Sequence, residues 1–176
     1  TTENLNVVVF QNGDSIPEAK TDEEWLKYGK EKQPAWCFYN NDTANGAKYG
    51  RLYNWYAVND SRGLVPKGWH VPSLNEWDTL ERSLGNASGR KMKTKTDWDR
   101  FGNGNNESGF SGLPAGLRYY NGTFRFLGLA TAFWSSDEPT DVKGTWGRGL
   151  VFYDKNILKG YDGRKDAGLS VRCIKN

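Results

Sequence analysis

The sequence predicts a single α+β domain with two short helices, small antiparallel sheets and long loops. Helix-start patterns lie in the first half of the chain, and short alternating apolar stretches fill the last third. Turn residues are dense, with 21 glycines among 176 residues, and glycine supplies the backbone conformations that tight turns need. A chain of this length fits one domain.

The first helix is expected to begin after Thr21. Glu24 follows three residues later, which is the spacing of a capping box, where each side chain bonds the backbone N–H of the other residue. Gly29 is expected to end this helix, because glycine favours unwound backbone. The element is therefore short.

The most clearly specified element is expected to begin after Ser73. Ser73 and Glu76 form a second capping box, and leucine and tryptophan then recur at helical spacing. Gly85 closes the pattern. We expect this helix to bury Trp77 and Leu80 against a sheet.

The rest of the chain is predicted to form short strands joined by long loops. Residues 86–112 are rich in turn residues and are expected to be loops anchored by Trp98, Phe101 and Phe110. For residues 53–57, alternation favours a strand, and a helix remains open. Further strands are expected from alternating apolar residues at 124–127, 132–135, 146–153 and 169–174.

The charge and hydropathy patterns argue against a nucleic-acid partner and against membrane insertion. Lys and Arg are scattered among Asp and Glu, with a net charge of +3 and no basic block, whereas a nucleic-acid-binding face needs clustered positive charge. No apolar run of about eighteen residues is present. We therefore expect no nucleic-acid partner and no membrane insertion of this domain.

A set of phrases occurs along the whole chain. With these phrases in this order, residues 1–176 resemble one Fibrobacter succinogenes major paralogous domain, whose first strand is expected to precede the first residue here. The phrases include Tyr49–Val58, Pro66–Ser73, Leu113–Arg118, Phe133–Ser136 and Leu169–Cys173.

The resemblance implies a C-type-lectin-like fold, similar to that of formylglycine-generating enzymes and of receptor proteins diversified by retroelements. It also implies a secreted or surface-anchored protein, such as a lipoprotein, of the Bacteroidetes type. Formylglycine-generating enzymes use two closely spaced cysteines, and this chain has no such pair. We therefore expect an extracellular or cell-surface domain that is not an enzyme.

The two cysteines leave their redox state open. Cys37 and Cys173 are separated by most of the chain, which excludes a Cys-x-x-Cys motif and a zinc site built from cysteine. A disulfide between them would stabilise the fold by about 4–5 kcal/mol in chain entropy, and two buried free thiols are equally expected. Many members of the family have a cysteine where this chain has Val65. If their usual bridge joins that position to Cys173, it is absent here.

No catalytic set is recognisable. The single histidine, His70, is expected to be a packed residue whose ring nitrogen satisfies a backbone carbonyl. No His-x-x-x-His pattern and no Gly-x-Ser-x-Gly elbow is present. A glycoside hydrolase needs two carboxylates at a defined separation. Several carboxylates are available on expected loops, namely Asp97, Asp99, Glu107, Asp137, Glu138 and Asp141.

No cofactor is expected, although a calcium ion remains open. Oxygen-rich side chains lie close together at Asn40–Asp42 and at Asp137–Glu138, without the spacing of a dedicated calcium loop. C-type lectins proper often bind sugar through calcium with a Glu-Pro-Asn motif. Residues 138–141 are faintly similar to that motif and depart from it at the third position.

The best binding candidate is the segment from Thr145 to Asp166, which mixes aromatic faces with forked polar groups. Small-molecule and glycan sites combine ring area with a few directional polar groups. In the retroelement-diversified relatives, the equivalent region carries the variable binding surface. The alternative is that Trp146, Phe152 and Tyr161 fill the core. The candidates are Trp146, Arg148, Tyr153, Asp154, Asn156, Tyr161, Asp162 and Arg164, bordered by Tyr119 and Tyr120.

We expect the domain to bind a glycan or cell-surface polysaccharide without catalysing a reaction, in adhesion or glycan capture. The second hypothesis is recognition of a surface protein, since the fold alone cannot discriminate between them. A glycosidase is the third. At least half of the eight tryptophans are expected in the core rather than on a binding surface.

Overall fold

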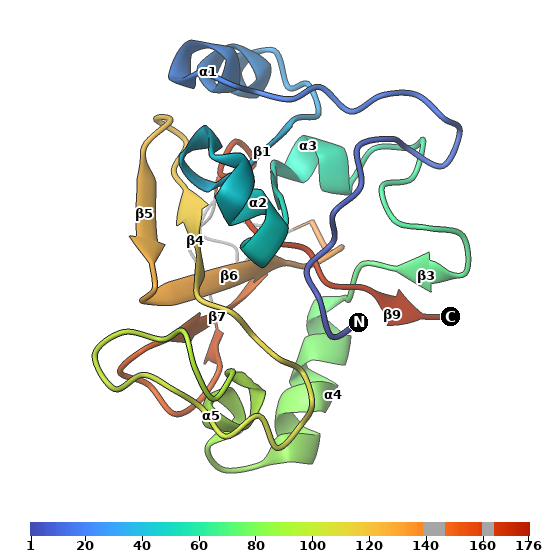
Figure 1. The fold of residues 1–176 in the computed structure, drawn as a ribbon. Helices are drawn as coiled ribbons and strands as arrows, with labels where there is room; N and C mark the ends of the chain where they lie inside the picture. Colours follow the sequence, from blue (N-terminus) through green and yellow to red (C-terminus); the bar gives the residue numbers. More distant parts are fainter. Residues whose placement is uncertain (139–146, 160–163) are drawn as a thin grey trace.

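The computed structural model describes residues 1–138, 147–159 and 164–176. Within these ranges it contains five α-helices, one short 3-10 helix and nine strands, so the fold is mixed α and β as predicted (Figure 1). The expectation of two helices was too low. The N-terminal amine donates to the backbone oxygen of Cys173 at 2.7 Å, and the two ends of the chain lie on the same side of the molecule in Figure 1.

A five-stranded sheet forms the centre of the molecule. Its neighbours are antiparallel except β4 and β6, which run parallel and pair at Gly116 and Thr131. A prediction of purely antiparallel sheets was therefore wrong at this one pair. In spatial order the strands are β5 (Phe124–Leu127), β4 (Ala115–Arg118), β6 (Ala130–Trp134), β7 (Gly147–Val151) and β8 (Leu158–Lys159).

Two smaller two-stranded sheets complete the described β-structure. One pairs β1 (Trp36–Cys37) with β2 (Leu52–Tyr53), and the other pairs β3 (Trp69–His70) with β9 (Ile174–Lys175). The long strand expected at 169–174 does not form. That segment instead crosses between elements and makes single bridges, such as Leu169 with Tyr53 and Ser170 with Phe133.

Both predicted capping boxes are present. In α1 (Asp22–Lys30), the Thr21 side chain accepts from the N–H of Glu24 and the Glu24 side chain accepts in return. The helix ends one residue after the expected Gly29. In α4 (Leu74–Leu84), Ser73 and Glu76 make the same reciprocal pair, and Gly85 follows the last turn with φ +63°.

Three further helices are present, of which two were not predicted and one begins within residues 53–57, where the sequence favoured a strand and left a helix open. They are short, and short helices give a weak periodic signal. The chain at 53–57 leaves β2 and turns into α3, because the Asn54 side chain accepts from the N–H of Ala57 at 3.0 Å and so caps a helix. The three helices are α2 (Thr43–Tyr49), α3 (Trp55–Val58) and α5 (Ser88–Met92).

More than half of the tryptophans lie in the core, as expected. Trp77 packs from α4 against Phe133 of β6 and Leu150 of β7, and Leu80 packs partly buried against the same cluster. This confirms the predicted docking of that helix on a sheet. Six of the seven described tryptophans are buried, namely Trp25, Trp36, Trp55, Trp77, Trp98 and Trp134.

One predicted loop anchor is wrong. Trp98 is buried and Phe110 packs against the α4 cluster, but Phe101 is fully exposed. Phe101 lies in a loop with a backbone φ of +62°. The loop turns at this residue, and the side chain stays outside the core.

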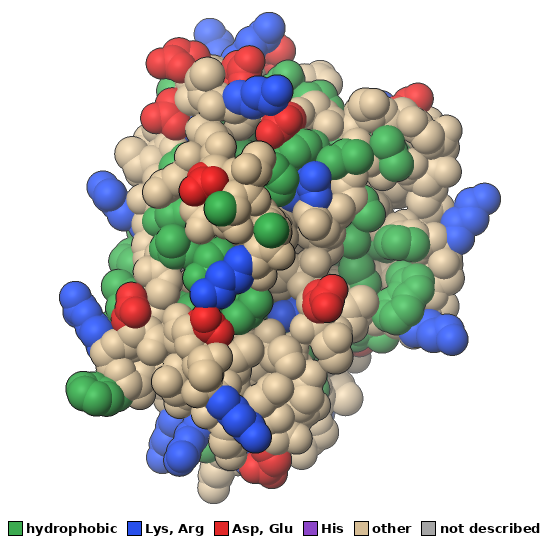
Figure 2. All heavy atoms as spheres, viewed as in Figure 1, with side chains coloured by type: hydrophobic (Ala, Val, Ile, Leu, Met, Phe, Trp, Pro, Cys, Tyr) green, Lys and Arg blue, Asp and Glu red, His purple; other side chains and the backbone are tan. Residues whose placement is uncertain are grey.

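Surface charge is dispersed over the face shown in Figure 2. Acidic and basic side chains alternate there, without a continuous basic area. This agrees with the scattered charges of the sequence. None of the helices in the described part of the chain is long and apolar enough to cross a membrane.

Candidate functional site: an aromatic groove

A groove of about 490 Å³ lies where β6 begins and β7 ends. Two pairs of aromatic rings line it, Tyr119 with Phe126 and Phe152 with Tyr153. Aliphatic side chains fill in between them, and Arg100 adds a guanidinium. Such a lining, with ring area and few polar groups, is typical of ligand-binding hollows. We call this site the aromatic groove.

Phe126 on β5 is the most unusual residue of the groove. Its ring is 41% exposed and meets the Tyr119 ring edge to face, with centroids 6.3 Å apart. The backbone of Phe126 has φ +67°, a region that costs a bulky residue about 1–3 kcal/mol. Backbone strain of this kind clusters at binding sites, and here it coincides with an aromatic ring left outside the core.

The turn after β7 presents Tyr153, which is 72% exposed. A buried lysine holds this turn: Lys93 Nζ donates to the backbone oxygen of Val151 at 2.9 Å and to that of Asp154 at 3.0 Å. Burial lowers the pKa of Lys93. Two hydrogen bonds from Lys93 therefore hold the turn that carries the exposed Tyr153 ring.

Arg100 supplies the directional polar group of the groove. Its guanidinium carbon lies 5.5 Å from the centroid of the Phe152 ring. A planar guanidinium offers several donors and stacks on aromatic faces. The groove thus combines ring area with hydrogen-bond donors at one point.

The structure brings some of the predicted binding residues together and separates others. Tyr119 and Tyr153 line the aromatic groove. Asp154 and Asn156 shape its turn, since Asp154 Oδ1 accepts from the N–H of Asn156 at 2.8 Å. Trp146, Tyr161 and Asp162 lie outside the described residues.

Two other predicted residues pair with each other outside the lining of the groove. The guanidinium carbon of Arg164 lies 4.3 Å from the centroid of the Tyr120 ring. Arg164 also donates to both carboxylate oxygens of Asp166, at 3.0 and 2.9 Å. Tyr120 and Arg164 therefore form a separate exposed pair.

Arg148 does not lie on a surface. It is 4% exposed, its Nη2 donates to Asp78 Oδ1 at 2.6 Å and its Nη1 donates to the backbone oxygen of Gly147 at 3.1 Å. The Arg148 guanidinium lowers the pKa of Asp78. This placement makes Arg148 a link between β7 and α4, and we leave it out of the binding site.

His70 is held differently from the expectation. Its ring nitrogens meet two side chains, Asn176 Oδ1 at 2.7 Å and Glu76 Oε1 at 2.8 Å, rather than a backbone carbonyl. The bond to Asn176 and the contact with Glu76 raise the pKa of His70. The sequence around His70 could not predict the contact with Asn176, because Asn176 lies 106 residues away.

Three of the predicted loop carboxylates, Asp97, Asp137 and Glu138, make structural contacts, and Asp141 lies outside the described residues. Asp97 pairs with Lys48 at 2.5 Å, and this bond, with that from Thr96, lowers the pKa of Asp97. Asp137 accepts from the N–H of Leu74, and Glu138 pairs with Lys165. A lowered pKa is the opposite of what a general acid needs.

One of the candidate calcium ligands, Asp42, is engaged in the fold. Asp42 caps α2, with its Oδ1 accepting from the N–H of Ala44 at 2.9 Å. In the part of the chain that the structure describes, no three metal-ligating carboxylates, histidines or cysteines form a group.

The two cysteines are free and buried, in different parts of the core. Cys37 packs with Trp25 and Tyr39, whereas Cys173 packs with Val171 and other residues of the largest cluster. Burial raises the pKa of Cys37 to about 12 and that of Cys173 to about 11. Neither thiol is ionised at neutral pH, so neither is primed as a nucleophile.

Sequence reasoning missed Phe126, Phe152, Arg100 and Lys93. Phe126 and Phe152 look like core residues in a strand pattern, and Lys93 looks like a surface charge. The composition of the segment around Tyr153 was a usable signal, since Tyr153 lines the aromatic groove.

The geometry defines a small α+β domain with an aromatic groove on the edge of its central sheet. The family model of the Fibrobacter succinogenes major domain matches residues 1–175, so the chain belongs to this family, as its motifs predicted. Neither the curated proteins nor the solved structures contain a match to the chain.

Proposed function

We propose that this domain binds a carbohydrate polymer in the aromatic groove, without catalysis, outside the cell or at its surface. One observation carries the proposal: two aromatic ring pairs and a guanidinium surround a single hollow. A sugar ring offers an apolar C–H face that packs on an aromatic ring, and hydroxyls that need directional partners. Tyr153, Phe126 and Arg100 supply both.

Binding without chemistry is supported by the groove's lining. Among the described residues that line it there is no carboxylate, whereas glycoside hydrolysis uses two, one of them with a raised pKa. The described lining also has no side-chain carboxylate or amide to serve as a calcium ligand. We therefore propose binding that is independent of calcium, in adhesion or glycan capture.

Recognition of a surface protein is the second candidate. It is favoured by exposed aromatic rings that do not line the groove, at Phe101 and Tyr120. Broad exposed aromatic patches are typical of protein interfaces. In that case a flat contact would extend past the groove instead of filling it.

The first experiment is a screen of the domain on arrays of glycans and polysaccharides, with calcium and then with chelator. We expect a hit that survives the chelator. For that hit, Tyr153→Ala and Phe126→Ala should each reduce affinity by about tenfold or more, because each removes a ring from the contact.

Tyr120→Ala is the matched control, since it removes an exposed tyrosine that does not line the groove. It should leave affinity unchanged. A screen without any hit would contradict the carbohydrate proposal and favour the protein candidate. A hit that the chelator abolishes would contradict calcium independence.

A further inference from the structure

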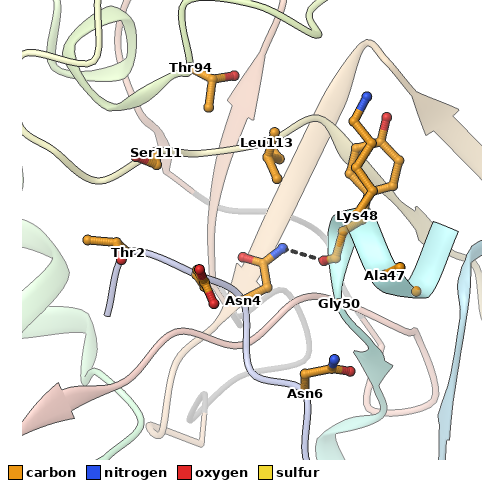
Figure 3. A pocket seen from close by; sticks show the side chains of 12 residues that line it. Thr2, Asn4, Asn6, Ala47, Lys48, Gly50, Thr94, Ser111 and Leu113 are labelled. Carbon is orange, nitrogen blue, oxygen red and sulfur yellow. Dashed lines mark hydrogen bonds between the residues drawn. The ribbon is translucent and has the colours of Figure 1, made fainter. Parts of the chain in front are cut away.

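A second hollow, of about 360 Å³, differs from the aromatic groove in every lining residue. In Figure 3 it lies between the N-terminal segment with Thr2, Asn4 and Asn6, the C-terminal end of α2, and the loop positions Thr94 and Ser111. Most of its lining is polar, with hydroxyls, amides and one charge of each sign. We call it the polar pocket.

A buried guanidinium ties two walls of the polar pocket together. Arg172 is 2% exposed. Its Nε donates to Asn4 Oδ1 at 2.7 Å, and its Nη1 donates to the backbone oxygens of Thr1 at 3.0 Å and Phe110 at 2.8 Å. Its Nη2 reaches the backbone oxygen of Ser111 at 3.1 Å. The N-terminal segment and the loop at 110–111 are thereby fixed relative to each other.

Asn4 joins the third wall to the first two. Its Nδ2 donates to the backbone oxygen of Tyr49 at 2.8 Å, the bond drawn in Figure 3. Gly50 permits this approach, because it has φ +76° and a Cβ there would lie 3.1 Å from the Cβ of Asn4. The hydrogen bonds of Arg172 and Asn4 thus connect the walls of the pocket before any ligand binds, which is the preorganisation that a binding site needs.

Ser111 adds backbone strain at the same place. It has φ +55°, and Asn106 holds it there by accepting from its N–H at 2.8 Å and donating to its Oγ at 2.9 Å. Backbone strain of this kind costs about 1–3 kcal/mol and clusters at functional sites. It coincides here with a preformed hollow.

The charges of the polar pocket select the kind of ligand. The Lys48 ammonium is neutralised by Asp97 at 2.5 Å, and Glu3 brings a carboxylate to the lining. Among the described residues that line the pocket, an anion would meet Glu3 without a free cation opposite. Mixed donors and acceptors suit a neutral ligand rich in hydroxyls.

We propose that the polar pocket binds one neutral sugar ring, such as the terminal unit of a glycan. Its volume lies at the lower end of the range for small-molecule sites, about 300–1,000 Å³, which fits one ring better than a chain. The half-buried Tyr49 ring and Leu113 offer apolar contact to its C–H face. This site is independent of the aromatic groove.

The test is an NMR titration of the isotope-labelled domain with methyl glycosides of neutral hexoses and N-acetylhexosamines. Glucuronate and glucosamine serve as charged comparators. We expect saturable shifts at the backbone amides of Gly50, Thr94 and Ser111 with at least one neutral ring, at millimolar concentration. No saturable shift for any neutral ring, or stronger binding of a charged comparator, would overturn the proposal.

A matched pair of substitutions on α2 tests the location. Ala47→Trp places a large ring at a lining position, whereas Ala44→Trp changes an exposed residue of the same helix outside the lining. The first should abolish the shifts and the second should preserve them. If Ala47→Trp does not fold, Thr2→Trp on the opposite wall is a second variant that fills the pocket. Persistence of the shifts in the blocked variant overturns the proposal.

Tyr153→Ala separates this inference from the proposed function. It should leave the shifts at the polar pocket intact, because Tyr153 lines only the aromatic groove. If Tyr153→Ala loses binding on the array but keeps the NMR shifts at the polar pocket, the sugar site in the pocket stands. Array binding through the groove without pocket shifts would overturn the pocket alone.

Discussion

The aromatic groove and the polar pocket are built in opposite ways. The rings of the groove lie on or beside strands and on a turn, and the buried Lys93 holds that turn. The walls of the polar pocket are tied together by the buried Arg172, which bonds segments from both ends of the chain. A ring of the groove can therefore be changed without disturbing the fold, whereas the pocket and the core both depend on Arg172.

The largest expected effect is that of Arg172→Leu. The substitution removes the guanidinium donors to the backbone oxygens of Thr1, Phe110 and Ser111 and to Asn4 Oδ1. Each buried acceptor left unpaired costs about 1–3 kcal/mol. We expect a loss of more than about 4 kcal/mol in the free energy of unfolding, measured by urea denaturation.

Arg164→Leu is the control for that measurement. Arg164 is exposed and pairs with Asp166 at 2.9 Å, and an exposed pair contributes about 0–1 kcal/mol. Similar losses in the two variants would contradict the role of Arg172 as a buried support. Arg172 itself stays protonated at neutral pH, because burial lowers its pKa only to about 10.

Arg148→Leu should have the next largest effect. It removes the bond to Asp78 at 2.6 Å, but Asp78 is partly exposed and keeps Lys159 at 3.4 Å. The remaining carboxylate is therefore less penalised than the orphaned carbonyls around Arg172. We expect a loss of about 2–3 kcal/mol in unfolding free energy. Affinity for the array hit should not change in the folded variant, and a selective loss of binding would return Arg148 to the site.

Local signals in the sequence predicted local structure well. The capping boxes at Thr21 and Ser73 were found because both partners lie within one turn of helix. The helix at Ser73 was also docked correctly, because the spacing of Trp77 and Leu80 defines one apolar face. Local chemistry sufficed for these two helices, whereas α2 was missed although its cap, Asp42 with the N–H of Ala44, is also local.

The candidate sites were predicted only in part, because their supports are distant in sequence. Tyr119 and Tyr153 were found from composition, but Lys93 bonds a turn 58 residues away, and Arg148 meets a carboxylate 70 residues before it. Arg172 bonds Thr1 across 171 residues. A pattern cannot show such pairs, and a charged residue in a strand looks the same whether it faces solvent or a buried carbonyl.

A smaller effect is expected for the pH dependence of the link between β3 and β9. The contacts with Asn176 and Glu76 raise the pKa of His70, so the charged ring favours the folded state. Its contribution is fully present below the ordinary histidine pKa of about 6.5 and is lost as pH rises through the higher folded value. Since the pair is partly exposed, we expect less than about 1 kcal/mol.

The measurement compares unfolding free energies of the wild type and His70→Asn from pH 5 to pH 9, a range of about two units either side of neutrality. The difference between them should shrink as the pH rises. A difference that grows with pH would contradict the raised pKa. Unlike Arg172, this surface link is expected to leave both binding sites unaffected.

The smallest expected effect on stability is that of Tyr153→Ala in the groove. Tyr153 makes an edge-to-face contact with Phe152 at 5.1 Å and is otherwise largely exposed. Its loss should change the free energy of unfolding by less than about 0.5 kcal/mol, while Phe133→Ala, in the core, should cost about 3–5 kcal/mol. A loss above about 2 kcal/mol for Tyr153→Ala would show that the turn needs its ring to fold. In that case reduced glycan binding by the variant would no longer report on the groove, and only Phe126→Ala could test it.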